Sequence, residues 1–120
     1  MEFKFKAWDI ENEHIVNWDE IQDGWESEGY YGSIFRQDHY ICLPSTNTYD
    51  VRGVEIYAGY ILSSEDGRVK FEVIYDNHKN TADGDFIGFG LRSLNSGEIR
   101  IYDKSYETML VIGTIFTYSD

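Results

Sequence analysis

The chain has 120 residues, of which 22 are acidic and 10 basic, so its formal net charge is −12 at pH 7. This excess of carboxylates argues against nucleic acids and anionic membranes as partners, because binding to either depends on Lys and Arg meeting phosphate. Aromatic residues make up 17% of the sequence, which favours strands over helices, and a single cysteine excludes an internal disulfide.

The N-terminal segment predicts a β-hairpin. Residues 2–8 alternate apolar and charged side chains, which places Phe3 and Phe5 on one face of a strand. Residues 14–18 predict a second short strand, which follows a polar turn. We therefore expect a hairpin over residues 2–18.

An acidic and aromatic segment, residues 19–32, follows without clear periodicity. Asp19 and Glu20 suit the first turn of a helix, because the helix dipole stabilises carboxylates there. Gly24 and Gly29 would end such a helix early. We expect an acidic loop with at most one or two short helical turns.

A second hairpin is predicted from residues 33–36 and 39–43, and Pro44 is expected to end it. Residues 44–50 are the most linker-like piece of the chain, but the apolar pattern resumes directly after them. We expect a joint there between two parts of one compact unit. The first part, residues 1–48, holds the hairpins and the acidic segment, and the second part is residues 49–120.

The second part of the chain predicts a small barrel. Residues 68–75 alternate well, and the Asp66-Gly67 pair before them is typical of a tight hairpin turn. Residues 76–85 are polar and predict a longer loop. With further strands expected over 54–62, 86–91, 99–102 and 109–116, the fold class is mainly β, a small SH3-like or partly open β-barrel over about residues 50–116.

Two glycines are expected to shape this barrel. Gly53 ends a turn that starts at Asp50, where a positive φ costs glycine little. Gly59 lies inside the strand predicted over 54–62, which is largely apolar on both faces. It therefore indicates a bulge or a close crossing of the backbone, as small barrels need at their corners.

Two stretches carry a recognisable pattern. The opening reads K-F-K-A-W-D from Lys4, and the central stretch reads D-V-R-G-V-E-I-Y-A-G-Y-I from Asp50. Shorter matching pieces stand at 88–91 and 111–116. Together they resemble the YopX-like proteins of phages and prophages. The residues that fit include Lys4, Phe5, Ala7, Trp8, Asp9, Asn12, Trp18, Asp50, Gly53, Glu55, Ile56, Tyr57, Gly59, Ile61 and Gly113.

The resemblance implies an origin and a compartment more than an activity. Such proteins are encoded by phages and prophages and act in the bacterial host cytoplasm, and the family has no established biochemical function and no accepted catalytic residues. The chain departs from the family pattern at Tyr60, where the family has Asp, and at Thr114, where it has Asn. We interpret the following matching residues as structural: Trp8, Asp9, Trp18, Gly53, Glu55, Tyr57, Gly59 and Gly113.

No motif in the sequence supplies a catalytic or metal-binding constellation. His14, His39 and His78 fall in three separate predicted elements, without the short spacing of a zinc site. The oxygen-rich segment 76–85 lacks the pattern of a calcium loop. We therefore predict no catalytic residue, no metal and no cofactor, and we expect the protein not to be an enzyme.

The acidic segment is the candidate partner surface. One interpretation gives Trp8 and Trp18 to the core and leaves the carboxylates solvated. In the other, exposed aromatic side chains anchor a protein partner and the carboxylates steer its basic surface. The residues of this candidate surface are Trp25, Tyr30, Tyr31, Asp19, Glu20, Asp23, Glu26 and Glu28.

Three functions stay open from the sequence. The first is a non-enzymatic module that binds a host or phage protein or its own copies, in its boldest form an acidic decoy for a DNA-binding protein. The second is a small enzyme that uses carboxylates and a histidine near 76–85, with His78 beside Asp83 or Asp85. The third, ranked last because of the charge, is single-stranded nucleic-acid binding by the barrel. A local basic patch for it would comprise Lys70, Lys79, Arg92, Arg100 and Lys104.

The expected compartment follows from composition. The sequence has no run of about 18 apolar residues that would span a membrane, and its start lacks the apolar core of a signal peptide. Cys42 stands between apolar neighbours and is expected to be a small buried residue in a reducing compartment. We expect a cytoplasmic homo-oligomer that binds no membrane.

Overall fold

The computed structural model describes residues 4–21, 40–81 and 83–118. Over these residues the protein is mainly β, with helical structure in short pieces, which confirms the predicted fold class. The chain divides into two compact units, residues 1–45 and 46–120. The boundary lies inside one strand, β3 (Tyr40–Tyr49), which runs from the first unit into the second.

The first unit contains the predicted N-terminal hairpin. Strands β1 (Phe5–Asp9) and β2 (His14–Val16) pair antiparallel. Asp9 closes the turn between them, because its carboxylate accepts hydrogen bonds from the side-chain amide of Asn12 at 2.9 Å and from its backbone N–H at 3.1 Å. These two bonds lower the pKa of Asp9 below its ordinary value.

A small apolar core holds the first unit together. Its buried members are Phe5, Ala7, Val16 and Ile21, and Trp18 and Tyr40 pack against them. The rings of Phe5 and Trp18 meet edge to face, with centroids 5.1 Å apart. Ile21 belongs to a helical turn over residues 18–21, which confirms the helical turn expected at Asp19 and Glu20.

Pro44 does not end its strand, contrary to the prediction. It lies within β3, opposite Phe5 of β1, and the ladder continues with a 2.8 Å bond from the N–H of Ser45 to the carbonyl of Lys4. Residues 45 and 4 therefore form a hydrogen-bonded pair, and Pro44 occupies the neighbouring position, whose N–H would point away from β1. The missing donor of proline costs no bond to β1 there. The linker-like stretch is for this reason mostly strand.

Cys42 was expected to be buried, and it is exposed. It lies on β3 next to the buried Leu43, whose side chain points to the opposite face of the strand. The apolar neighbours of Cys42 in the sequence therefore do not enclose it.

The predicted strand 54–62 is two strands. In the second unit β4 (Glu55–Tyr57) pairs with β3, whereas β5 (Tyr60–Ser63) pairs with β6 and β9 of another sheet. The chain changes sheet at Gly59, which has a φ of +88°. Its N–H donates to Val73 and its carbonyl accepts from Ile115, both at 2.7 Å. The predicted backbone crossing at Gly59 is confirmed, and the single strand is corrected.

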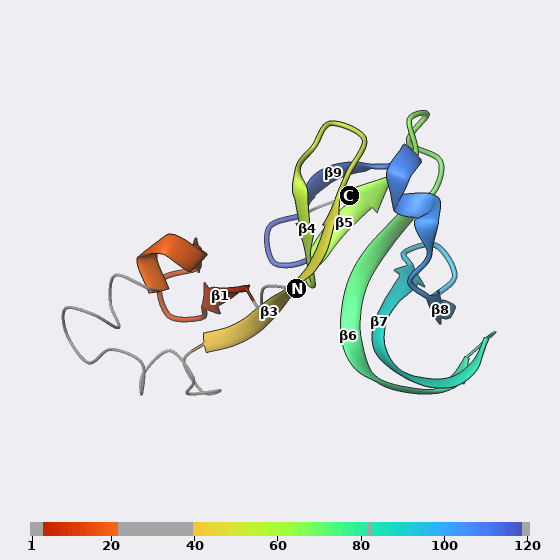
Figure 1. Ribbon diagram of the computed structural model, residues 1–120, viewed down its shortest axis with the longest axis horizontal. Coiled ribbons are helices and arrows are strands. Elements are labelled where there is room, and N and C mark those ends of the chain that lie inside the picture. Colours follow the sequence, from red (N-terminus) through yellow and green to blue (C-terminus); the bar gives the residue numbers. More distant parts are fainter. Residues whose placement is uncertain (1–3, 22–39, 82, 119–120) are drawn as a thin grey trace. The chain divides into compact units, whose positions relative to one another are not determined.

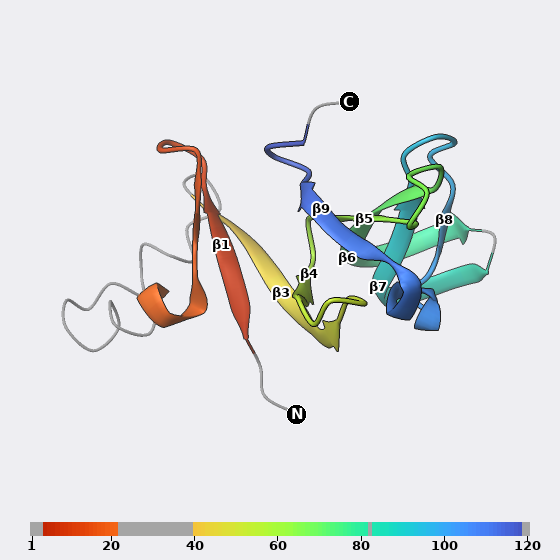
Figure 2. The ribbon, with the colours of Figure 1, turned by 90° about the horizontal axis from the view of Figure 1, so that it is seen from above.

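Five antiparallel strands form the main sheet described in the second unit, in the order β8-β7-β6-β5-β9. The sheet curls into a half-barrel, with β8 and β9 at its two ends (Figures 1 and 2). The partly open form of the predicted barrel is therefore the one observed. The bounds are β6 (Lys70–Thr81), β7 (Gly84–Ser93), β8 (Ile99–Ile101) and β9 (Leu110–Thr114), with a 3₁₀ helix η1 (Lys104–Thr108) before β9.

The prediction of a long loop over the polar stretch 76–85 is wrong. It continues β6 and begins β7, and the two strands make a long curved hairpin that Figure 1 shows in green and cyan. Asn80 has a positive φ of 58° near the tip. Cross-strand pairing extends from Phe71 with Ser93 to Thr81 with Gly84, so backbone hydrogen bonding outweighs the low strand propensity of Asp and Asn there.

The core of the second unit lies where its elements converge. It consists of Ile56, Leu62, Phe71, Val73, Leu91 and Met109, with Phe89, Tyr102 and Val111 packed against it. The members come from β4, β5, β6 and β7 and from the residue before β9. Burial of side chains of this size stabilises a fold by about 1.5–3 kcal/mol each before the entropy of ordering is subtracted.

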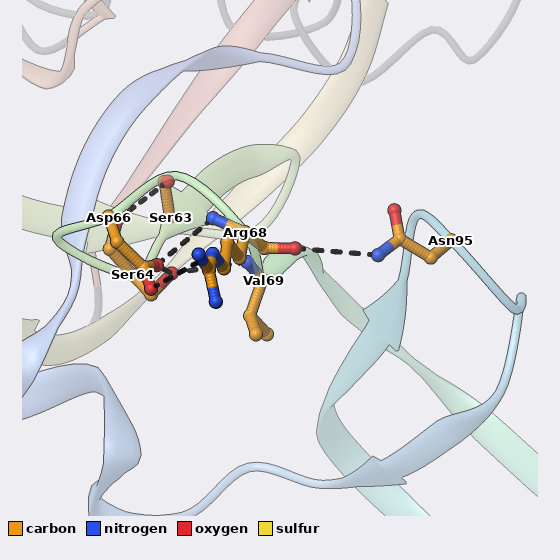
Figure 3. Close-up of polar contacts among 6 residues, drawn as sticks. All are labelled: Ser63, Ser64, Asp66, Arg68, Val69 and Asn95. Atoms are coloured by element: carbon orange, nitrogen blue, oxygen red, sulfur yellow. Dashed lines mark hydrogen bonds and ion pairs between the residues drawn. The ribbon is translucent and has the colours of Figure 1, made fainter.

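The turn predicted from Asp66 and Gly67 is confirmed, between β5 and β6. Asp66 accepts hydrogen bonds from the hydroxyl of Ser64 at 2.7 Å and from the N–H of Arg68 at 3.1 Å (Figure 3). Gly67 supplies the positive φ, 76°. A neighbouring loop reaches this turn through the side-chain amide of Asn95, 3.5 Å from the carbonyl of Arg68.

The outer edge of β9 is covered by the turn after β3. The side chain of Asp50 accepts a hydrogen bond from the N–H of Val111 at 2.9 Å. The guanidinium of Arg52 donates to the carbonyl of Val111, also at 2.9 Å. The N–H of Val51 donates to the carbonyl of Met109 at 3.1 Å. The carbonyl of Met109 and the backbone groups of Val111 on this edge are therefore already bonded, and another strand would have to displace these bonds to pair there.

The other end of the sheet is covered by the hairpin tip. Tyr102 donates its N–H to Phe89 of β7, so the N–H of Ile101, one residue earlier, points to the outer side of β8. The carboxylate of Asp83 accepts that N–H at 2.9 Å. The curvature of the hairpin thus brings its tip back to the edge of the sheet.

Candidate binding surface

The predicted partner surface is described at two of its eight residues. Asp19 and Glu20 are exposed on the helical turn 18–21. The amide of Asn17, just before the turn, donates to the carboxylate of Glu20 at 3.4 Å. The other six, Asp23, Trp25, Glu26, Glu28, Tyr30 and Tyr31, lie outside the described residues, so this surface stays a prediction.

The residues that carry the family resemblance occupy structural positions. In the first unit Trp8 and Asp9 are buried and Trp18 packs on the core. In the second unit Gly53 is exposed in its turn, with a φ of +83°, and Gly113 lies on β9 opposite Ile61. The stretch 50–61 thus builds the turn over β9 and the crossing between sheets. Glu55 is half-buried on β4, Tyr57 is buried, and Gly59 makes the crossing.

Asp50 accepts hydrogen bonds from three backbone N–H groups. Burial alone would raise the pKa of its carboxyl. The backbone N–H groups of Val111, Val54 and Arg52 all donate to it, at 2.8 to 2.9 Å, and the guanidinium of Arg52 lies 3.9 Å away. These bonds outweigh burial, so the pKa of Asp50 lies below its ordinary value.

Tyr60 stands where the family pattern has Asp, and its side chain is buried. It is 7% exposed, and its ring packs beside Tyr57 with centroids 5.6 Å apart. At this position the chain therefore has an aromatic packing contact.

His78, Asp83 and Asp85 all form hydrogen bonds to backbone groups. His78 is 5% exposed, its Nε2 lies 3.0 Å from the carbonyl oxygen of Gly88, and its ring packs on Phe86. Asp83 accepts from Ile101, and Asp85 accepts from the N–H of Asn80 at 2.9 Å. His78 thus contacts Gly88 and Phe86, whereas Asp85 bonds within the hairpin tip and Asp83 bonds to the edge strand β8.

A shallow groove of about 420 Å³ lies beside β8. Asp83 and Glu98 contribute carboxylates to it, and the guanidinium of Arg100 donates to Asp103 at 2.6 Å and lies over the ring of Phe71. Ser93, Ser96 and Ile101 complete the lining. The groove therefore combines an ion pair with two further carboxylates.

The clearest exposed apolar feature is on the curved hairpin. Tyr75 lies opposite Phe89, and Ile87 is the next residue of β7 on the same face. Tyr75 is 55% and Ile87 77% exposed. We refer to Tyr75, Ile87, Phe89 and Tyr102 as the hairpin face.

The aromatic members of the hairpin face form a row. Tyr75 and Phe89 meet edge to face at 4.8 Å, and Phe89 and Tyr102 follow at 6.2 Å. The hydroxyl groups of Tyr102 and Thr48 are 2.8 Å apart and share a hydrogen bond. Phe89 and Tyr102 also pack on the core, so the row leads from the core to the exposed end of the hairpin.

The hairpin face was missed at the sequence level because residues 76–85 were interpreted as a loop. The available signal was the spacing of Tyr75 within 68–75 and of Ile87 and Phe89 within 86–91. Joining these two strands into one hairpin would have placed the three side chains together. What the spacing cannot show is where the core ends: Val73 is fully buried, whereas Tyr75 is mostly exposed.

Within residues 4–21, 40–81 and 83–118, no three or more His, Cys, Asp or Glu side chains group in a way that could hold a metal ion. Over the same part of the chain, no helix combines the length and apolarity needed to cross a membrane.

The chain matches one family over nearly its whole length. No curated protein gives a match. The family model described as YopX protein matches residues 4–120, which includes both compact units and every stretch that carried the resemblance. The chain therefore belongs to the YopX protein family.

Proposed function

We propose that the protein is a non-enzymatic protein-binding module, encoded by a phage or prophage and acting in the cytoplasm of a bacterial host. The observation that carries the proposal is the hairpin face. Ile87 is 77% exposed and lies on the same face as Tyr75, on the strand paired with it. Large aromatic and aliphatic side chains held on rigid elements are typical anchors of protein interfaces.

The charge favours a basic partner. The net charge of −12 produces a negative field that speeds encounter with positive surfaces and discourages nucleic acids and anionic membranes. Asp19 and Glu20 add exposed carboxylates in the first unit. A basic DNA-binding protein of the host or the phage, held by an acidic decoy, is the boldest form of this proposal.

The test uses the whole chain, immobilised and exposed to bacterial lysate at low and at moderate salt. We expect a retained protein that, once identified and purified, binds the chain saturably with a fixed stoichiometry in calorimetry. We expect its affinity to fall as the salt concentration rises, because screening weakens charge attraction. The proposal is wrong if no retained protein binds saturably when purified.

A further inference from the structure

We propose that the partner docks on the hairpin face, and that it is a folded protein with an apolar contact surface rimmed by Lys and Arg. This inference rests on the proposed function and adds the surface and the partner chemistry to it.

The edges of the half-barrel are poor sites for strand addition. At β9, both backbone groups of Val111 are bonded to the side chains of Asp50 and Arg52. At β8, the outward N–H of Ile101 is bonded to Asp83. A partner that added a strand would have to displace these bonds first, so the open surface of the hairpin is the easier route.

The hairpin face is prepared for contact. Tyr75 is held by its edge-to-face contact with Phe89, and Tyr102 is held by its bond to Thr48. Side chains that are already ordered lose little conformational entropy on binding. Ile87 is the most exposed large hydrophobic residue described, and burying it would release the most water.

The charge of the hairpin selects a basic partner. Asp85 stands two residues before Ile87 on β7 and therefore lies on the same face, and Asp83 lies at the tip, whereas Asp76, next to Tyr75, points to the opposite face. Hydrogen bonds fix the carboxylates of Asp83 and Asp85 at the tip. A second copy docked through the same face would place like charges together, whereas a Lys/Arg rim would pair with them.

The experiment places a photo-crosslinking phenylalanine analogue at position 87 of the whole chain, and in a matched control at position 112. Ile112 is also an exposed isoleucine, at 41%, but lies on β9, with β5 and β6 between it and β7. The probes are two fractions of bacterial lysate, the proteins retained by a cation exchanger and those that pass through. We expect a discrete adduct from the retained fraction at position 87 and none at position 112.

Affinity measurements with the purified adduct partner complete the test. We expect Ile87→Ser and Tyr75→Ser each to weaken binding on the order of tenfold or more, as hot-spot truncations do, while Ile112→Ser leaves it unchanged. Unchanged circular dichroism would show that the variants are folded. Asp83→Ala, which frees the edge of β8, should not strengthen binding.

Five results would overturn the inference. An adduct only from the flow-through fraction would mean a partner without a basic surface. A dimer adduct from the purified chain alone would mean a second copy. Tighter binding by Asp83→Ala would mean strand addition at β8. Full binding by the Ile87 and Tyr75 variants would show that the hairpin face is not the docking site, and would leave the proposed function standing. The absence of any saturable partner would refute both the docking site and the proposed function.

Discussion

The carboxylate of Asp83 accepts a hydrogen bond from the backbone N–H of Ile101 at 2.9 Å. Asp83 belongs to the tip between β6 and β7, whereas Ile101 ends β8 on the far side of β7. The bond therefore closes the curved hairpin onto the edge of its own sheet. It links the shape of the half-barrel to the protection of that edge.

We expect Asp83→Ala to lower the free energy of unfolding by about 0.5–1.5 kcal/mol, the typical net worth of one hydrogen bond. The sharper readout is local. Amide exchange at Ile101 should speed up strongly, because its N–H loses the carboxylate, while exchange at Val73 in the core should speed up only as far as the global stability falls. Unchanged protection of the Ile101 amide would contradict this relationship.

The corresponding residue at the other edge, Asp50, should matter more. Asp50→Ala leaves the N–H groups of Val111, Val54 and Arg52 without their acceptor. Since an unsatisfied buried group costs about 1–3 kcal/mol and water can reach some of these, we expect a loss of about 2–4 kcal/mol. Urea denaturation measures it. Asp66→Ala in the exposed turn of Figure 3 is the control, and an equal or larger loss there would refute the ranking.

The lowered pKa of Asp50 also predicts how stability depends on pH. The folded state holds the carboxyl ionised to lower pH than the unfolded chain does, so the contribution is complete above about pH 4–5. It is lost as the pH falls through the folded pKa. Asp9 and Asp66 have lowered pKa values too, and act in the same direction.

Unfolding curves between pH 7 and pH 2.5 test this linkage. Wild type should lose stability steadily below about pH 4. Asp50→Asn should start less stable at pH 7, because its amide presents N–H donors near the N–H of Val111, and should lose less on acidification. A wild type whose stability rises on acidification would reverse the sign and rule out the assignment.

The parts of the fold that could be predicted from the sequence depend on neighbours in the chain. Asp66 and Gly67 make their turn through bonds to Ser64 and Arg68, within a few residues. The Asp9 turn is equally local. Short-range chemistry of this kind is visible in the sequence, because residue type and spacing alone decide it.

The parts that could not be predicted depend on partners far away in the sequence. Pro44 stays in a strand because its register with Phe5 leaves its missing N–H on the side away from β1. The polar residues 76–81 stay in a strand because β7 pairs with them. The exposure of Tyr75 and Ile87 depends on where other elements stop covering the sheet, which no local pattern records.

The last prediction concerns Gly59. The sequence predicts a backbone crossing at this glycine, but not its two long-range hydrogen bonds. Its N–H donates to Val73 of β6 and its carbonyl accepts from Ile115 in the turn after β9, so two segments hold the residue at a φ of +88°. Gly59→Ala should therefore lower the free energy of unfolding by about 1–2 kcal/mol or more, since an L side chain is strained at this φ and the backbone is not free to relax.

Gly67→Ala is the matched control: its φ of +76° is similar, and a Cβ there would meet nothing within 4 Å in an exposed turn. Thermal unfolding should show a larger loss for Gly59→Ala than for Gly67→Ala. Equal losses would mean that the φ angle alone sets the cost, and that the crossing between the sheets adds nothing to it.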